Sequence, residues 1–274
     1  MAEPFGIDSL SVEPQDAATR VRDNWLVVKH EVADEASKHG RDPAEIKIVG
    51  VTKYVDAAIT QWLVAAGCHD LGENRPQHLW AKAAELTPVP STQDSDTDED
   101  QSICWHQIGH LQRNKVRRLL RSTSGSLFVH AVDNAALLQV LAEEAERQQC
   151  DVDVLIEVNI SDEEAKTGLP AKKLGEFWDD SHDRITKAMH SAATGSGGVR
   201  IRGLMAMAGW GTDALAAQTQ FRQLRELRDR LQSEWGLTMP ELSMGMSGDF
   251  PAAIAEGATM VRIGSRLFAG LRSD

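Results

Sequence analysis

The stretch "IKIVGVTKYV", residues 46–55, gives the first indication of the fold. It opens with alternating β-branched residues, which favour a β-strand, and it sets Lys53 just beyond the apolar run. Before it, apolar residues recur at helical spacing over residues 21–32, and Gly40 follows as the predicted helix end. After it, residues 59–66 have the pattern of a second, shorter helix. The stretch therefore predicts a strand that lies between two helices and ends at a lysine.

The same alternation of strand and helix continues along the chain. The further predicted strands are residues 69–72, 104–109, 127–132, 153–160, 200–207, 241–245 and 259–264. The predicted helices between them are residues 76–86, 113–120, 135–149 with Asp133 as the cap, a helix from Pro170, residues 213–235, and a short helix capped near Asp249. The strands are apolar on both faces, which is typical of a parallel sheet covered by helices.

Eight such units in roughly 250 residues match the size of a closed barrel. We therefore predict an α/β fold, a single (β/α)8 TIM-type barrel over residues 15–274 with an extra N-terminal helix, preceded by an N-terminal tail at residues 1–14. A doubly wound open sheet is the alternative. The acidic, proline-containing residues 87–102 predict a flexible surface loop, and the glycine-rich residues 194–198 a flexible connector.

Composition narrows the class of protein. The net charge of −12 argues against a chain that coats nucleic acid or an anionic membrane, because both surfaces repel it. The first two dozen residues carry acids and no continuous apolar stretch, so they do not resemble a secretory signal, and no uncharged apolar run reaches about 18 residues. Three widely spaced cysteines favour reduced thiols over a disulfide framework or a zinc cluster. We expect a soluble cytoplasmic protein without nucleic-acid or membrane partners.

Polar residues follow the ends of several predicted strands. In a parallel barrel these ends converge on one mouth, where ligands bind. They are Lys53, Glu73, Asn74, His106, Asn159, Ser161, Met207, the segment 243–247 and the segment 262–265. The last two segments, "SMGMSG" and "RIGS", combine glycine, serine and arginine as a phosphate-binding loop does. Barrels commonly hold phosphate after strands seven and eight, so we predict a phosphate site here.

The position of Lys53 allows two interpretations. A lysine opposite a phosphate site can form a Schiff base with an aldehyde, and a strand-end lysine can equally reach into solvent. His106 and His110 lie four apart, but Gly109 separates them and no third ligand is evident, so this pair does not predict a metal site.

Six segments in order carry a resemblance to a known family. They are "VGVTKYV", "LGENRPQ", "WHQIGHLQRNK", "VNISDEEAKTG", "RGLMAM" and "LSMGMSGDFPAAIAEGATMVRIGSRLFAG". Together they resemble the pyridoxal phosphate homeostasis protein family from about residue 15 to residue 270. The departures are the acidic stretch before Cys104 and an enlarged segment at about residues 180–199.

The resemblance implies a barrel similar to the N-terminal domain of alanine racemases, with pyridoxal 5'-phosphate bound as an aldimine to Lys53. It implies that serine and glycine of the last two loops surround the phosphate, that Arg262 lies near the pyridine nitrogen, and that Asn74 and His106 lie around the ring. The implied cofactor-binding residues are Lys53, Asn74, His106, Met207, Ser243, Gly245, Ser247, Arg262, Gly264 and Ser265.

The expected function is intracellular pyridoxal phosphate homeostasis, in which the chain buffers the cofactor or delivers it to pyridoxal phosphate-dependent apoenzymes. A racemase of this fold takes a tyrosine from a separate C-terminal β-domain, but this chain ends soon after Ala269. Its only tyrosine, Tyr54, follows Lys53, and strand alternation predicts that the two side chains point to opposite faces. We therefore expect a monomer without robust catalysis. The alternatives are a pyridoxal phosphate-dependent amino-acid enzyme such as a racemase, and a phosphosugar-type barrel enzyme that uses Lys53.

Overall fold

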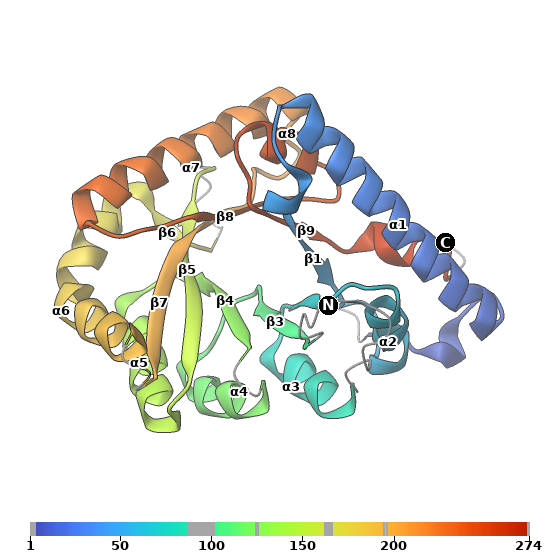
Figure 1. Cartoon of the computed structure of the whole chain (residues 1–274), viewed down its shortest axis with the longest axis horizontal. Coiled ribbons are helices and arrows are strands. Elements are labelled where there is room, and N and C mark those ends of the chain that lie inside the picture. Colours follow the sequence, from blue (N-terminus) through green and yellow to red (C-terminus); the bar gives the residue numbers. More distant parts are fainter. Residues whose placement is uncertain are drawn as a thin grey trace.

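The fold is a closed barrel of eight parallel strands ringed by helices (Figure 1). The computed structural model describes residues 4–86, 102–123, 126–161, 167–193, 195 and 197–272. The predicted acidic loop, residues 87–102, lies outside the described residues except for its last position, and the predicted connector, residues 194–198, is described only in part.

The barrel strands follow one another around the sheet in the order β4-β3-β2-β1-β9-β8-β7-β5, and β4 pairs with β5 to close it. Every pairing is parallel, and a short strand, β6, adds to β5 near the mouth. The closure confirms the predicted (β/α)8 barrel and excludes the open doubly wound sheet. The strands are β1 (Lys47–Val51), β2 (Asp70–Glu73), β3 (Cys104–Gln107), β4 (Leu127–Val132), β5 (Asp151–Asn159), β6 (Leu169–Pro170), β7 (Gly198–Met205), β8 (Glu241–Met246) and β9 (Met260–Ile263).

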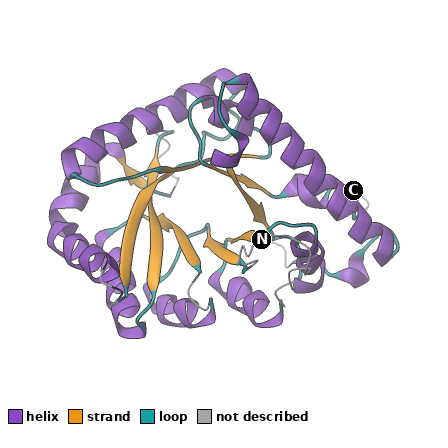
Figure 2. Ribbon diagram, viewed as in Figure 1, coloured by secondary structure: helices purple, strands orange, loops and turns teal. Residues whose placement is uncertain are grey.

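Helices cover the outside of the barrel (Figure 2). The α-helices are α1 (Pro14–Lys38), α2 (Ala57–Ala65), α3 (Pro76–Glu85), α4 (Val116–Ser122), α5 (Ala135–Gln148), α6 (Leu174–Ala193), α7 (Ala214–Trp235) and α8 (Phe250–Ala255). Short 3₁₀ turns are η1 (Ile7–Ser9), η2 (Pro43–Glu45), η3 (Arg113–Lys115), η4 (Ala171–Lys173) and η5 (Ser265–Phe268). The extra N-terminal helix α1 is confirmed, and it packs against α2, α8 and η5. No helix within these described ranges is long and apolar enough to cross a membrane.

Several local expectations need correction. The side chain of Asn134, not that of Asp133, caps α5 by accepting a hydrogen bond from the amide of Leu137. The helix predicted from Pro170 begins later, because Pro170 ends β6 and the 3₁₀ turn η4 comes before α6. The predicted tail packs against the turn after β1: the amide of Phe5 donates to the carbonyl of Tyr54 at 2.9 Å, and Phe5 pairs with Val55.

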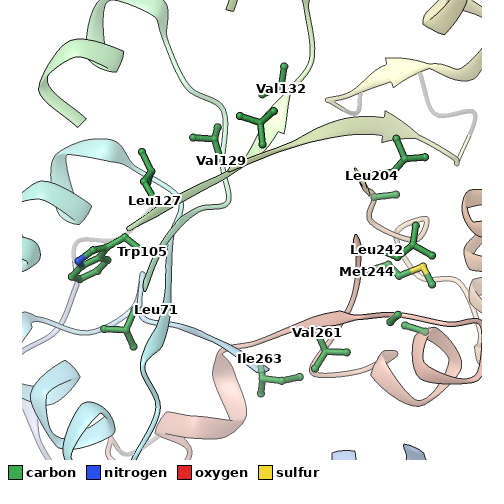
Figure 3. Close-up of a cluster of buried hydrophobic side chains, with 14 of the residues drawn as sticks. Leu71, Trp105, Leu127, Val129, Val132, Leu204, Leu242, Met244, Val261 and Ile263 are labelled. Carbon is green, nitrogen blue, oxygen red and sulfur yellow. The ribbon is translucent and has the colours of Figure 1, made fainter. Parts of the chain in front are cut away.

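Two buried apolar clusters lie on opposite faces of the strands. The larger one lies between the barrel and its helices and includes Leu71, Trp105 and Leu204 (Figure 3). The second contains Phe128, Leu155, Met205 and Met260. Because neighbouring strand residues point to opposite faces, as Leu204 and Met205 do, the second cluster lies on the inner face of the barrel.

Candidate functional site

Lys53 lies in the turn that follows β1, at the mouth of the barrel. Its side chain is half-buried, and Nζ lies 4.9 Å from the centroid of the Tyr54 ring. The prediction that Tyr54 points away from Lys53 is therefore wrong. Strand alternation does not apply here, because both residues lie beyond the last strand residue in a turn. The ring of Tyr54, which is 44% exposed, gives the amine a cation–π contact.

The loops after β8 and β9 meet beside this turn. The amide of Gly264 donates a hydrogen bond to Oγ of Ser247 at 3.4 Å. A Cβ atom on Gly264 would lie 3.2 Å from Cε2 of Tyr54, so the absence of a side chain there lets the Lys53–Tyr54 turn pack against β9. Gly245 has φ of +90°, and a Cβ atom there would lie 2.6 Å from Cβ of Ala253. The structure thus brings the predicted lysine and the predicted phosphate loops together.

Three further predicted residues lie at the same end of the barrel. Ser265 is exposed and begins η5 directly after Gly264. Met207 is half-buried just beyond β7. Asn74 is half-buried after β2, and its backbone carbonyl accepts a hydrogen bond from Nε2 of Gln107 at 3.2 Å.

Arg262 supplies a buried cation on the inner face of β9. Its Nη1 donates to the carbonyl oxygen and to Oγ of Ser243, at 2.7 and 2.6 Å, and its Nη2 donates to the carbonyl of Ala206 at 3.0 Å. Burial lowers the pKa of the guanidinium to about 10, although Asp249 and Glu157 favour its charged form. Among the described residues, no carboxylate forms a salt bridge with it. A buried cation in this state can bind an anion or donate to a ligand.

A chain of hydrogen bonds runs from Ser243 down the inside of the barrel. Nδ1 of His130 lies 3.0 Å from Oγ of Ser243, and Nε2 of His130 lies 2.8 Å from Nδ1 of His106. Nε2 of His106 lies 2.9 Å from Oδ1 of Asp70, at the opposite end of the barrel. The ring of His106 also stacks on Phe128. Hydrogen bonds through His130 and Ser243 therefore connect His106 with Arg262 near the mouth.

The two histidines have opposite charge preferences. Burial opposes charge on His106, but the hydrogen bonds and charges of Asp70 and Cys104 together outweigh it and raise the pKa of His106 to about 9. Burial, and then the charges of His106 and Arg262, holds the pKa of His130 well below its usual value. The pair of histidines therefore carries one positive charge, which lies on His106, the ring that contacts Asp70.

A buried ion pair supports the turn that holds Lys53. Nζ of Lys82 on α3 donates to Oε1 of Glu73 at 2.5 Å and to the carbonyl of Thr52 at 2.7 Å, and Oγ1 of Thr52 donates to the same oxygen of Glu73 at 2.9 Å. Sequence reasoning placed Glu73 at the mouth but missed Lys82, whose position in an amphipathic helix resembles that of any solvated lysine.

Glu157 is an acidic residue that sequence reasoning missed. It lies buried on β5, and its Oε1 accepts a hydrogen bond from Oγ1 of Thr167 at 2.5 Å. Burial raises the pKa of this carboxyl group. A glutamate inside the apolar strand "DVLIEVNI" was the available signal, because a buried charge in a strand requires a partner.

Comparisons with known proteins agree with this geometry. The family model "Alanine racemase, N-terminal domain" matches residues 100–271. A protein of Aquifex aeolicus named pyridoxal phosphate homeostasis protein is 33% identical over 241 residues, which cover 88% of this chain and 94% of that protein. A protein of the same name from Pseudomonas aeruginosa is 34% identical over 248 residues, with coverage of 90% and 94%.

Two solved structures are also similar. PipY of Synechococcus elongatus PCC7942, solved with PLP bound, matches with a TM-score of 0.66 and 32% identity, over 87% of this chain and 100% of that chain. A protein of unknown function from Bifidobacterium adolescentis matches with a TM-score of 0.77 and 28% identity, over 94% of this chain and 98% of that chain.

Proposed function

The chain belongs to the pyridoxal phosphate homeostasis protein family, and from this premise we propose that it binds pyridoxal 5'-phosphate and serves to buffer or deliver that cofactor inside the cell. PipY, a solved relative, is described with PLP bound. The racemase alternative has less support, because the relatives that match over nearly their full length carry the homeostasis name.

The observation that carries the proposal is that a half-buried amine and a buried guanidinium lie at the same mouth of the barrel. Lys53 offers a half-buried amine in the turn after β1, and Arg262 offers a guanidinium without a salt-bridge partner in the described parts of the chain. A pyridine aldehyde would satisfy both groups, because the amine can react with the aldehyde and the guanidinium can donate a hydrogen bond to the ring nitrogen. The residues present therefore fit the cofactor.

We assign roles to the remaining residues on the same basis. The backbone amides and hydroxyls of Gly245, Ser247, Gly264 and Ser265 hold the phosphate, as loops at this end of a barrel commonly do. Asn74 and Met207 line the space around the ring. Ser243 is fully buried and accepts a hydrogen bond from Arg262, so its role is to orient the guanidinium, and His106 acts on it through His130. Lys53 binds the cofactor covalently through its amine.

The cofactor would supply an electron-withdrawing ring whose carbonyl carbon reacts with amines. Arg262 would lie beside the ring nitrogen, where it cannot accept a proton, and this favours binding of the cofactor over strong carbanion chemistry. We therefore propose that the protein is a carrier without robust turnover, that it acts as a monomer in the cytoplasm, and that pyridoxal phosphate-dependent apoenzymes are its recipients.

Reduction with borohydride followed by peptide mapping tests the attachment. The full chain, loaded with pyridoxal phosphate and reduced, is expected to carry the cofactor on the peptide that contains Lys53, and Lys53→Ala is expected to lose both the label and the visible absorption of the bound cofactor. Lys47→Ala is the matched control, because Lys47 lies at the other end of the same strand. A label that persists in Lys53→Ala would contradict the assignment.

Incubation of the loaded protein with a panel of amino acids separates a carrier from an enzyme. We expect no turnover in the usual enzyme range, which begins at about 1 per second. Turnover at that rate or faster, lost in Lys53→Ala, would establish the racemase-type alternative instead.

A further inference from the structure

A cluster of metal-ligating side chains lies at the N-terminal end of the barrel, opposite the mouth. Asp70 on β2 and Cys104 on β3 are partners in the parallel register, and His106 follows Cys104 by two residues. Residues two apart in a strand point to the same face, so the thiol and the imidazole both point inward. One ligand atom from each of the three side chains lies within 4.8 Å of the other two.

We propose that Asp70, Cys104 and His106 form a binding site for a divalent transition metal of the zinc class. A thiolate, an imidazole and a carboxylate are the ligand types that Zn²⁺ takes, and three protein ligands leave a fourth position for water. Bonds of about 2.0 to 2.3 Å place tetrahedral ligand atoms about 3.5 Å apart. Nε2 of His106 is already 2.9 Å from Oδ1 of Asp70, and the ligand atoms of all three side chains lie within 4.8 Å of one another, so the set is close to that spacing.

The surroundings of His106 also fit a metal ligand. A histidine that binds a metal through one nitrogen usually donates a hydrogen bond from the other, which fixes its tautomer. Nδ1 of His106 faces Nε2 of His130 at 2.8 Å, so His130 lies where the acceptor of that bond is needed. His106 itself is fully buried, while the side chain of Asp70 is 26% exposed and gives the cluster an opening to solvent.

One neighbour of the cluster competes with a bound metal ion. Lys47 opposes a metal, because its Nζ lies 3.3 Å from Oδ1 of Asp70. The Lys47 side chain is 40% exposed, so it can swing into solvent when an ion binds. Lys47 thus lowers the affinity without blocking the site.

Titration of the full chain with Co²⁺ under reducing conditions tests the site, and its readout does not depend on the proposed function. We expect one equivalent to bind, with a thiolate-to-cobalt charge-transfer band and the visible bands of a tetrahedral ion. Cys104→Ser is expected to lose the charge-transfer band, and Asp70→Asn to bind more weakly. His130→Gln, which changes the acceptor behind the ligand, is expected to weaken binding about 10- to 100-fold.

Cys150→Ser is the matched control, because Cys150 is also a half-buried free thiol but lies outside the cluster. Lys47→Gln is expected to bind Co²⁺ more tightly than the unchanged chain, because a competing positive charge is removed. No saturable binding, a charge-transfer band that survives in Cys104→Ser or disappears in Cys150→Ser, or an affinity in Lys47→Gln that does not rise would each overturn the site.

Discussion

Replacement of Lys82 by methionine is expected to destabilise the barrel far more than replacement of an ordinary surface lysine. Lys82 is 4% exposed and its partner Glu73 is fully buried, and the two are joined at 2.5 Å. Methionine keeps the length of the side chain, but among the described residues it leaves the Glu73 carboxylate with only the hydroxyl of Thr52 as a donor. The carbonyl of Thr52 loses its lysine donor as well.

Removing one partner of a buried ion pair typically costs about 3–5 kcal/mol, because the remaining charge stays buried without compensation. That is a large part of the roughly 5–15 kcal/mol that stabilises a typical protein. Urea unfolding, followed by tryptophan fluorescence, measures the loss. Because Thr52 immediately precedes Lys53, the variant is also expected to attach pyridoxal phosphate more slowly, in a borohydride-trapping time course.

A double variant separates the charge from the packing. Glu73→Gln combined with Lys82→Met is expected to recover most of the lost stability, since replacing both buried charges is often close to neutral. Lys38→Met serves as the control, because Lys38 is exposed and pairs with Glu35 at the end of α1, so no resolvable change is expected. A loss below about 1 kcal/mol in Lys82→Met, the range of exposed pairs, would refute the reasoning. So would a double variant as unstable as Lys82→Met alone.

Three further predictions concern the site. The histidine pair is expected to stabilise the fold most near pH 6.5. The pKa of His106 is raised to about 9, so its contribution to stability is lost as the pH rises from 6.5 through 9. The pKa of His130 lies well below 6.5, so its contribution is lost as the pH falls below 6.5. Urea midpoints across this range check it, and a His130→Gln variant with an unchanged acid side would contradict it. Gly245→Ala is expected to weaken pyridoxal phosphate binding and lower the melting temperature, because φ is +90° and the methyl group would lie 2.6 Å from a neighbouring Cβ; Gly248→Ala, with no atom within 4 Å of its Cβ position, should match the unchanged chain in both assays. Tyr54→Phe is expected to leave cofactor attachment intact, because the amine of the neighbouring lysine contacts the ring, and a loss of attachment on trapping would show that the hydroxyl group takes part.

The barrel could be predicted from the sequence because its evidence is local. Each strand is a short apolar run, each helix has its own periodicity, and eight repeats with parallel character leave few arrangements other than a closed barrel. Lys53 and Arg262 were predictable for a related reason, since the carboxyl ends of parallel strands converge wherever the strands lie in the sequence. The fold class alone is therefore enough to predict that Lys53 and Arg262 lie at the same mouth.

The contacts between distant residues could not be predicted in the same way. The link between Asp70 and His106 depends on the register of β2 against β3, which a shift of one residue would reverse. The pair of Glu73 and Lys82 depends on the angle at which α3 leaves the barrel. His130 gave no signal, because a histidine in the run "LFVHAV" is indistinguishable from a packed core residue. The rule that neighbouring side chains alternate between faces failed for Tyr54, because that rule holds only within a strand and Tyr54 lies in a turn.

The direction of the hydrogen bonds connects the two ends of the barrel. The carboxylate of Asp70 only accepts, so Nε2 of His106 carries a proton, and the raised pKa of His106 adds one on Nδ1. Neutral His130 then accepts at Nε2 and donates from Nδ1 to Oγ of Ser243, the oxygen that also accepts from Arg262. A metal ion in place of the proton on Nε2 of His106 leaves this order unchanged, because Nδ1 still donates to His130. Removal of the Asp70 charge takes away one of the two groups, with Cys104, that raise the pKa of His106. Hydrogen bonds therefore connect the buried guanidinium at the mouth to a carboxylate at the opposite end of the barrel.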